Sequence, residues 1–271
     1  MSHSLRYTVN CSMLFTELPL LERPEAVKAA GFDAVEFWWP FAEAVPSDRD
    51  VDGFVSAVQD AGVQLTGLNF FAGDMPGGDR GLVSWPARQP EFLANIDVVV
   101  AIAERLGTRA FNALYGNRLD DTTAEAQDEL AVENLAAAAK AVGNLGGIVL
   151  VEPVSGAPRY PILTTAEALA VLDRAHRAGA DNVRLLCDLY HLATNGDDLD
   201  DAVRNVGPIG HVQIADAPGR GEPGTGELDI DGYLTTLQAG GYDGYVGLEY
   251  KPTTTTEVSL AWLPRERRAS A

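Results

Sequence analysis

Acidic side chains end three short aliphatic segments of the chain, and a glutamine lies near the end of a fourth. The four residues are Glu152, Asp188, Glu249 and Gln213. Aliphatic runs of this length are typical of buried strands in a parallel sheet. Three carboxylates and one carboxamide oxygen are ligands that suit Mg²⁺ or Mn²⁺. A single acid of this kind could cap a loop or pair with an arginine, but four in succession indicate a shared metal site.

The glutamine lies in the segment 210–216, which runs directly into a glycine- and proline-rich loop, 217–227. Alternation along this strand places Gln213 and His211 on the same face, where His211 either supports a metal ligand or contacts a substrate. Polar side chains that face inward from a buried strand are costly unless something there binds them. Arg220, in the loop, either pairs with a neighbouring acid or holds a substrate carboxylate with its planar guanidinium.

Four further side chains are candidates for substrate contact. His191 follows the strand-end aspartate by three residues and is expected to face the same cavity. Lys251 would face it as well, on a strand that continued beyond Glu249. Glu36 and Asn69 end two earlier predicted strands and could line the opposite wall of the site.

These residues need a scaffold that brings the ends of distant strands together. Apolar runs predict strands at 5–11, 33–38, 64–71, 109–114, 147–153, 183–188, 209–215 and 245–249. Helical patterns, several of them followed by glycine, predict helices at 18–30, 48–61, 90–106, 122–144, 165–178, 198–206, 230–239 and 256–263. Eight strands alternating with eight helices predict an α/β protein with a (β/α)₈ barrel, whose active site lies at the carboxyl ends of the strands.

No linker interrupts this alternation, so we expect one domain over residues 1–271, with 264–271 either a flexible tail or part of an interface. The net charge of −19 disfavours nucleic acid and anionic membranes as partners. No apolar run is long enough to span a membrane, the N-terminus has no signal-peptide core, and the two cysteines suit a reducing compartment. We therefore expect a cytoplasmic protein, and the sequence leaves open whether it forms a homo-oligomer.

The chain resembles the hydroxypyruvate isomerase family of the xylose isomerase-like TIM barrels. The resemblance extends over nearly the whole sequence. Its most specific segments are His-Val-Gln-Ile-Ala-Asp at 211–216, Arg-Gly-Glu-Pro-Gly-Thr-Gly-Glu at 220–227 and Gly-Leu-Glu-Tyr-Lys-Pro at 247–252. Further segments are 10–15, 30–37, 80–82 and 132–135.

The resemblance implies one divalent metal ion, Mg²⁺ or Mn²⁺, with four ligands from this chain: Glu152, Asp188, Gln213 and Glu249. It also assigns the catalytic acid and base roles to Glu152 and Glu249. The metal would polarise the substrate carbonyl while a proton moves between adjacent carbons through an enediolate. Arg220, together with Lys251, would hold the carboxylate of the substrate.

The implied reaction is that of an intramolecular oxidoreductase, which interconverts hydroxypyruvate and tartronate semialdehyde. The substrate is thus a small carboxylate or sugar acid. Isomerisation of 2-oxo-tetronates is an alternative within the same fold. Epimerisation of ketoses at carbon 3 is another, although those enzymes have histidine as the fourth ligand, where this chain has Gln213. A metal-free sugar-acid binding module is the non-enzymatic alternative, and the intact set of four ligands disfavours it.

Overall fold

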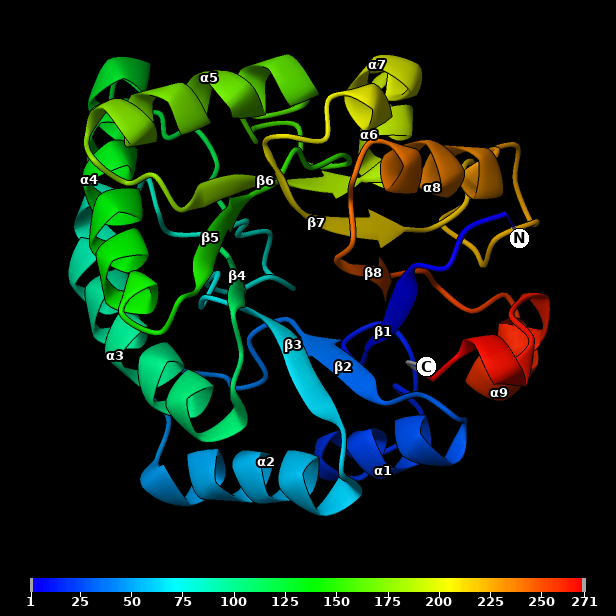
Figure 1. Ribbon diagram of the computed structural model, residues 1–271. Coiled ribbons are helices and arrows are strands. Elements are labelled where there is room, and N and C mark those ends of the chain that lie inside the picture. The colour runs from blue at the N-terminus through cyan, green and yellow to red at the C-terminus, as the bar shows by residue number, and fades with distance from the viewer. Residues whose placement is uncertain (1, 270–271) are drawn as a thin grey trace.

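Eight parallel strands form a closed barrel at the centre of the molecule, and the helices lie around its outside (Figure 1). The structure is a computed structural model and describes residues 2–269. The strands pair in chain order and β1 closes the ring against β8. They are β1 Arg6–Asn10, β2 Ala34–Phe37, β3 Gln64–Asn69, β4 Ala110–Asn112, β5 Ile148–Val151, β6 Val183–Asp188, β7 Ile209–Ile214 and β8 Tyr245–Leu248. The predicted (β/α)₈ barrel is therefore confirmed.

The helices are α1 Arg23–Ala29, α2 Asp48–Ala61, α3 Gln89–Leu106, α4 Ala124–Gly143, α5 Thr165–Arg177, α6 Leu189–Asn195, α7 Leu199–Arg204, α8 Ile230–Ala239 and α9 Thr256–Ser259. Short 3₁₀ turns cover Leu20–Glu22, Pro86–Arg88, Leu260–Trp262 and Arg265–Arg267. The caps follow from local chemistry. Ser47 accepts a hydrogen bond from a backbone N–H of α2, and Thr164 and Glu167 form a capping box on α5.

Three helices differ from the sequence prediction, and one of them, α9, ends at Ser259, before the 3₁₀ turn at Leu260–Trp262. The helix predicted at 18–30 is shorter, because it begins at Arg23 after a 3₁₀ turn, with Pro24 in its first turn, where proline is tolerated. Helix α6 was not predicted, and it starts directly after Asp188. The Oδ1 atom of Asp188 caps this helix by accepting hydrogen bonds from the backbone N–H groups of Tyr190 and His191. His191 therefore lies in a first helical turn, where we expected the start of a loop.

Apolar side chains from the strands and from the inner faces of the helices form one continuous core. Ala131, Ala138 and Ala139 of α4 are buried, which lets this helix approach the barrel closely. Gly210 in β7 allows a similar approach inside the barrel, since a Cβ atom there would lie 2.6 Å from the Cβ of Arg184. The core therefore fixes the relative positions of the strand ends.

The segment after residue 263 lies against the barrel. Arg265 and Arg268 donate hydrogen bonds to backbone carbonyls of α1 and its C-cap, and Arg267 donates to the carbonyl of His3. Residues 270 and 271, the end of the segment that we expected as a tail or an interface, lie outside the described residues. None of the described helices has both the length and the apolar character that crossing a membrane requires.

The loop after β7 is organised by one buried carboxylate. Asp216 accepts hydrogen bonds through Oδ1 from the backbone N–H groups of Ala217 and Leu228, and through Oδ2 from that of Gly224. Its own N–H donates to the carbonyl of Gly221. Three donors from a twelve-residue stretch thus converge on one side chain, which holds the loop that carries Arg220.

We predict that Asp216→Ala lowers the free energy of unfolding by about 3 kcal/mol, because several buried N–H groups lose a charged acceptor. Urea denaturation followed by circular dichroism measures this change. Asp60→Ala is the control, since Asp60 is exposed on α2. Equal stability of the two variants would show that the loop does not depend on Asp216.

Candidate active site

Every strand of the barrel places a polar side chain at or beside its carboxyl end. In chain order they are Asn10, Glu36, Asn69, Asn112, Glu152, Asp188, Gln213 and Glu249, and all eight are buried. Sequence reasoning identified six of them and missed Asn10 and Asn112. Both strands end earlier than predicted, at Asn10 instead of residue 11 and at Asn112 instead of residue 114, so neither residue lay at a predicted strand end.

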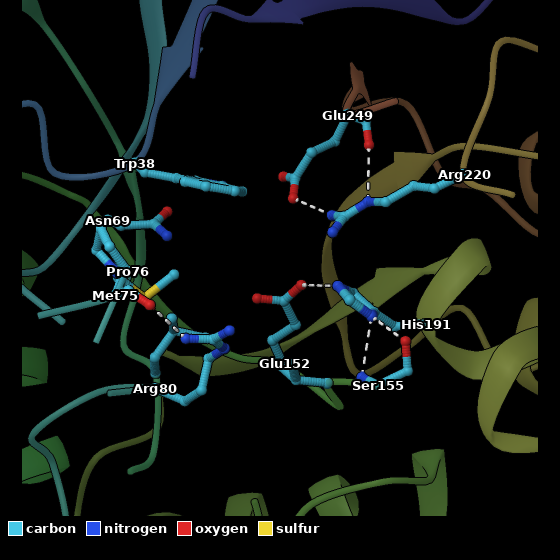
Figure 2. A pocket seen from close by; sticks show the side chains of 12 residues that line it. Trp38, Asn69, Met75, Pro76, Arg80, Glu152, Ser155, His191, Arg220 and Glu249 are labelled. Carbon is cyan, nitrogen blue, oxygen red and sulfur yellow. Dashed lines mark hydrogen bonds and ion pairs between the residues drawn. The ribbon is translucent and has the colours of Figure 1, made fainter. Parts of the chain in front are cut away.

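A cavity of about 350 Å³ opens over these strand ends. Its lining residues are Trp38, Asn69, Met75, Pro76, Arg80, Leu114, Glu152, Val154, Ser155, His191, Arg220 and Glu249. Figure 2 shows Glu249 and Glu152 directed into the same central space from two sides, with Arg220 and His191 along one wall. A volume of this size suits a small metabolite.

The carboxylates of this site are crowded and buried. Burial, together with the negative charge of Asp188, raises the pKa of Glu152 to about 8. Burial also raises the pKa of Glu249 well above its usual range. The charge of Arg220 opposes this shift, and those of Glu152 and Asp188 add to it. Both effects have one cause, which is that negative charge is concentrated where little water can solvate it.

Amide side chains hold the two glutamates in place. Asn112 donates from Nδ2 to Oε2 of Glu152 at 2.7 Å. Asn10 donates from Nδ2 to Oε2 of Glu249 at 2.9 Å and to Oε1 of Glu36 at 3.1 Å. The two strand ends that the sequence analysis missed therefore orient both predicted acid/base residues.

Two oxygens of the predicted ligand set have no hydrogen-bond partner among the residues that the structure describes. They are Oδ2 of Asp188 and Oε1 of Gln213, both buried. The amide of Gln213 is oriented by Glu36, because its Nε2 donates to Oε1 of Glu36 at 2.7 Å and leaves the oxygen unpaired. Unpaired buried acceptors are costly unless a cation or donor satisfies them. The donor set therefore fits a hard divalent cation.

The structure also brings a histidine to this group. Glu152, Asp188 and His191 each offer an atom within 4.8 Å of the others, so they could hold a metal ion. The Nδ1 atom of His191 accepts a hydrogen bond from the backbone N–H of Ser155 at 2.9 Å, and burial lowers the pKa of His191 to about 4. The neutral ring therefore carries its proton on Nε2, 3.7 Å from Asp188 and 3.9 Å from Glu152. A protonated Nε2 donates to carboxylates and does not ligate a metal.

Arg220 is engaged by carboxylates. Its Nη2 lies 2.6 Å from Oε1 of Glu249 and 3.8 Å from Oδ2 of Asp188, and its Nε donates to the carbonyl of Glu249. The guanidinium also lies over the ring of Tyr190. Its backbone has a φ of 61°, a left-handed conformation that is costly for a residue other than glycine. Such strain is kept where the surrounding structure enforces it, as at functional sites.

Of the other residues predicted to contact substrate, one lines the cavity and the others do not. Asn69 lines the cavity, as predicted for the opposite wall. Glu36 and His211 lie beneath it, joined at 2.7 Å between Oε2 and Nε2, and they are absent from its lining. Lys251 does not face the cavity. The strand ends at Leu248, so alternation does not continue, and the Lys251 side chain is exposed. We therefore leave Lys251 out of the proposed site.

Sequence reasoning did not assign Arg80 or Ser155 to the site. Ser155 fixes the His191 ring, and Arg80 reaches the cavity from the loop after β3. The loop after β3 has no periodicity that would show which of its side chains faces the cavity.

A sequence profile described as the xylose isomerase-like TIM barrel matches residues 24–266. A Streptomyces coelicolor protein with the provisional name hydroxypyruvate isomerase is 51% identical, with 98% of each chain covered. The Escherichia coli hydroxypyruvate isomerase is 34% identical over 96% of this chain and 98% of its own. The 2-oxo-tetronate isomerase of Cupriavidus necator is 32% identical over 95% and 97%.

Among solved structures, a Brucella melitensis protein described as an AP endonuclease of family 2 superimposes with a TM-score of 0.86. It is 34% identical and covers 95% of this chain and 97% of its own. The named isomerases align over nearly the whole of this chain. The chain belongs to the hydroxypyruvate isomerase family of the xylose isomerase-like TIM barrels.

Proposed function

We propose that the protein is an isomerase that interconverts hydroxypyruvate and tartronate semialdehyde (2-hydroxy-3-oxopropanoate). The observation that carries this proposal is a pair of buried glutamates, Glu152 and Glu249, directed into one small cavity (Figure 2). The names of the relatives at 51% and 34% identity support the same reaction. Moving a proton between adjacent carbons needs a base that removes it and an acid that returns one, and two carboxyl groups beside the substrate can divide these roles.

One divalent ion, Mg²⁺ or Mn²⁺, fits the site. We propose Glu152, Asp188, Gln213 and Glu249 as its ligands. Two observations support this assignment: one oxygen each of Asp188 and Gln213 accepts no hydrogen bond from the described residues, and the pKa values of the two glutamates are raised. Such an ion would supply electrophilic polarisation of the substrate carbonyl and neutralise developing negative charge.

The glutamates then move the proton. One removes a proton from C3 of hydroxypyruvate and the other delivers one to C2, while the hydroxyl proton shifts from the oxygen on C3 to that on C2. A divalent ion held by both carboxylates would lower their pKa values, so the reactivity of each as a base depends on how it is oriented toward the substrate carbon. Asn112 and Asn10 keep the two groups oriented, and Nε2–H of His191 stabilises negative charge near Glu152.

A 2-oxo-tetronate is the second candidate substrate, because the cavity of about 350 Å³ has room for a fourth carbon and one relative carries that name. Gln213 at the fourth ligand position disfavours a ketose 3-epimerase. A nucleic-acid substrate is disfavoured by the net charge of −19. The two buried free cysteines are compatible with the cytoplasmic location that we expect.

The proposed function is tested by incubating the protein with Mg²⁺ or Mn²⁺ in heavy water and following substrates by NMR. We expect metal-dependent deuterium uptake and isomer formation with hydroxypyruvate. Deuterium uptake with 2-oxo-tetronates alone would show that these acids are the substrates, and the proposed proton transfer would still stand. Absence of exchange with either acid and with free ketoses would refute the proposal.

Glu249→Gln and Glu152→Gln should each reduce kcat by at least about 10³-fold, because the amide cannot exchange the proton that general acid–base catalysis requires. The fold should persist, since glutamine keeps the volume of glutamate. Glu227→Gln, in the exposed part of the loop after β7, is the control. Near-normal turnover by either buried variant would remove that residue from the proton path.

Asp188→Asn should weaken Mn²⁺ binding by about 10-fold or more, because the proposed ligand loses its negative charge. Electron paramagnetic resonance of free Mn²⁺ measures the dissociation constant without any need for turnover. Asp243→Asn, at an exposed aspartate, controls for net charge. Unchanged affinity in Asp188→Asn would exclude Asp188 as a ligand.

A further inference from the structure

Arg80 is the second arginine on the cavity wall, and its environment is unlike that of Arg220. Figure 2 places it on the side of the cavity away from Arg220, with its side chain directed toward Glu152. Its Nη1 atom donates to the backbone carbonyls of Met75 and Asp79, at 2.9 and 2.6 Å. Within residues 2–269, no side chain accepts a hydrogen bond from Arg80 or forms an ion pair with it.

The nearest acid along the chain does not neutralise this charge. Oδ2 of Asp79 lies 2.9 Å from Nη1 of Arg88 and also accepts the backbone N–H of Asp74. Arg88 in turn pairs with Glu91. Asp79 is therefore part of a separate ion-pair group with Arg88 and Glu91. It does not neutralise the positive charge of Arg80, which lies on the cavity wall.

The backbone around Arg80 is fixed on both sides. Its carbonyl accepts the N–H of Gly116, and the N–H of Gly81 donates to the carbonyl of Ala72. Gly81 has a φ of 104°, and a Cβ atom there would lie 1.8 Å from the carbonyl oxygen of Leu114. Only glycine allows this approach. The guanidinium is thus presented from a rigid loop, which reduces the entropic cost of binding a ligand.

The substrate itself carries a negative charge that this site must accommodate. A carboxylate cannot lie against Glu152 or Glu249 without repulsion, and the guanidinium of Arg220 is already matched by Glu249. Of the two arginines that line the cavity, Arg80 alone has Nε and Nη2 without a described partner. A planar guanidinium with two such donors matches the two oxygens of a carboxylate.

We propose that Arg80 binds the carboxylate of the substrate and thereby makes the site select 2-oxo acids over uncharged ketoses. This inference rests on the proposed function, and it assigns the carboxylate to Arg80 in place of Arg220. Arg220 then serves to compensate the charge of Glu249 beside the reacting carbons.

Hydroxypyruvate and dihydroxyacetone test the assignment, because the second has a hydroxymethyl group where the first has a carboxylate. Arg80→Gln should raise KM for hydroxypyruvate about 10- to 100-fold, the range expected for loss of hydrogen bonds to a charged group. Deuterium exchange into dihydroxyacetone should change less than about twofold. Arg80→Lys should give an intermediate KM for hydroxypyruvate, since lysine keeps the positive charge but lacks the planar pair of N–H donors. Arg159→Gln, at an exposed arginine, is the control.

Calorimetric titration with glycerate, an unreactive reduced analogue, gives a readout that does not depend on turnover. Its affinity should fall in Arg80→Gln and remain unchanged in Arg159→Gln. Equal losses with hydroxypyruvate and dihydroxyacetone, or no loss with either, would overturn the role of Arg80 while leaving the isomerase proposal intact. If the wild-type protein binds glycerate through Arg80 but isomerises no hydroxypyruvate, the proposed reaction fails and the anion site stands.

Discussion

The concentration of buried negative charge at the mouth of the barrel is the constraint on which the site depends. Glu36, Glu152, Asp188 and Glu249 are each at most 5% exposed, and all of them lie at or beside the carboxyl ends of strands of one closed ring. Burying even one carboxylate without compensation costs several kcal/mol. Four are tolerable only because every one receives hydrogen bonds or positive charge, and because the set fits a cation.

The buried negative charge is compensated both in the cavity and beneath it. Beneath the cavity, Glu36 receives hydrogen bonds from Asn10 and Gln213 and is paired with His211. This arrangement does more than satisfy Glu36. It directs the oxygen of Gln213 away from Glu36, and it places Asn10 where it also holds Glu249. A residue that never reaches the substrate cavity thus sets the orientation of two groups that we assign to the metal.

The sequence could predict the site wherever periodicity and topology determine position. Parallel strands of a closed barrel end on one rim, so an acid at the end of each of three strands predicts a cluster before any coordinate is known. Prediction failed where the backbone leaves the strand. Lys251 lies beyond the end of β8, so strand alternation no longer applies to it. Helix α6 depends on a cap from Asp188, a residue that had been assigned to a strand end alone. The place of Arg80 depends on contacts of Gly81 with Ala72 and Leu114, which are remote in sequence and have no local signature.

An acidic protein that takes an acidic substrate must overcome its own repulsion, and net charge is a poor guide to how it does so. The relevant quantity is the field inside the cavity, where Arg80 and Arg220 meet different surroundings although they are the same residue type. Arg220 lies among carboxylates, and its positive charge compensates their negative charge. Among the described residues, the hydrogen-bond acceptors of Arg80 are backbone carbonyls, which orient a guanidinium without cancelling its charge. If Arg80 binds the anion as we propose, placing one arginine in each environment separates stabilisation of the proposed acid–base groups from recognition of the substrate. The same cavity can then hold several carboxylates of its own and still favour a carboxylate ligand.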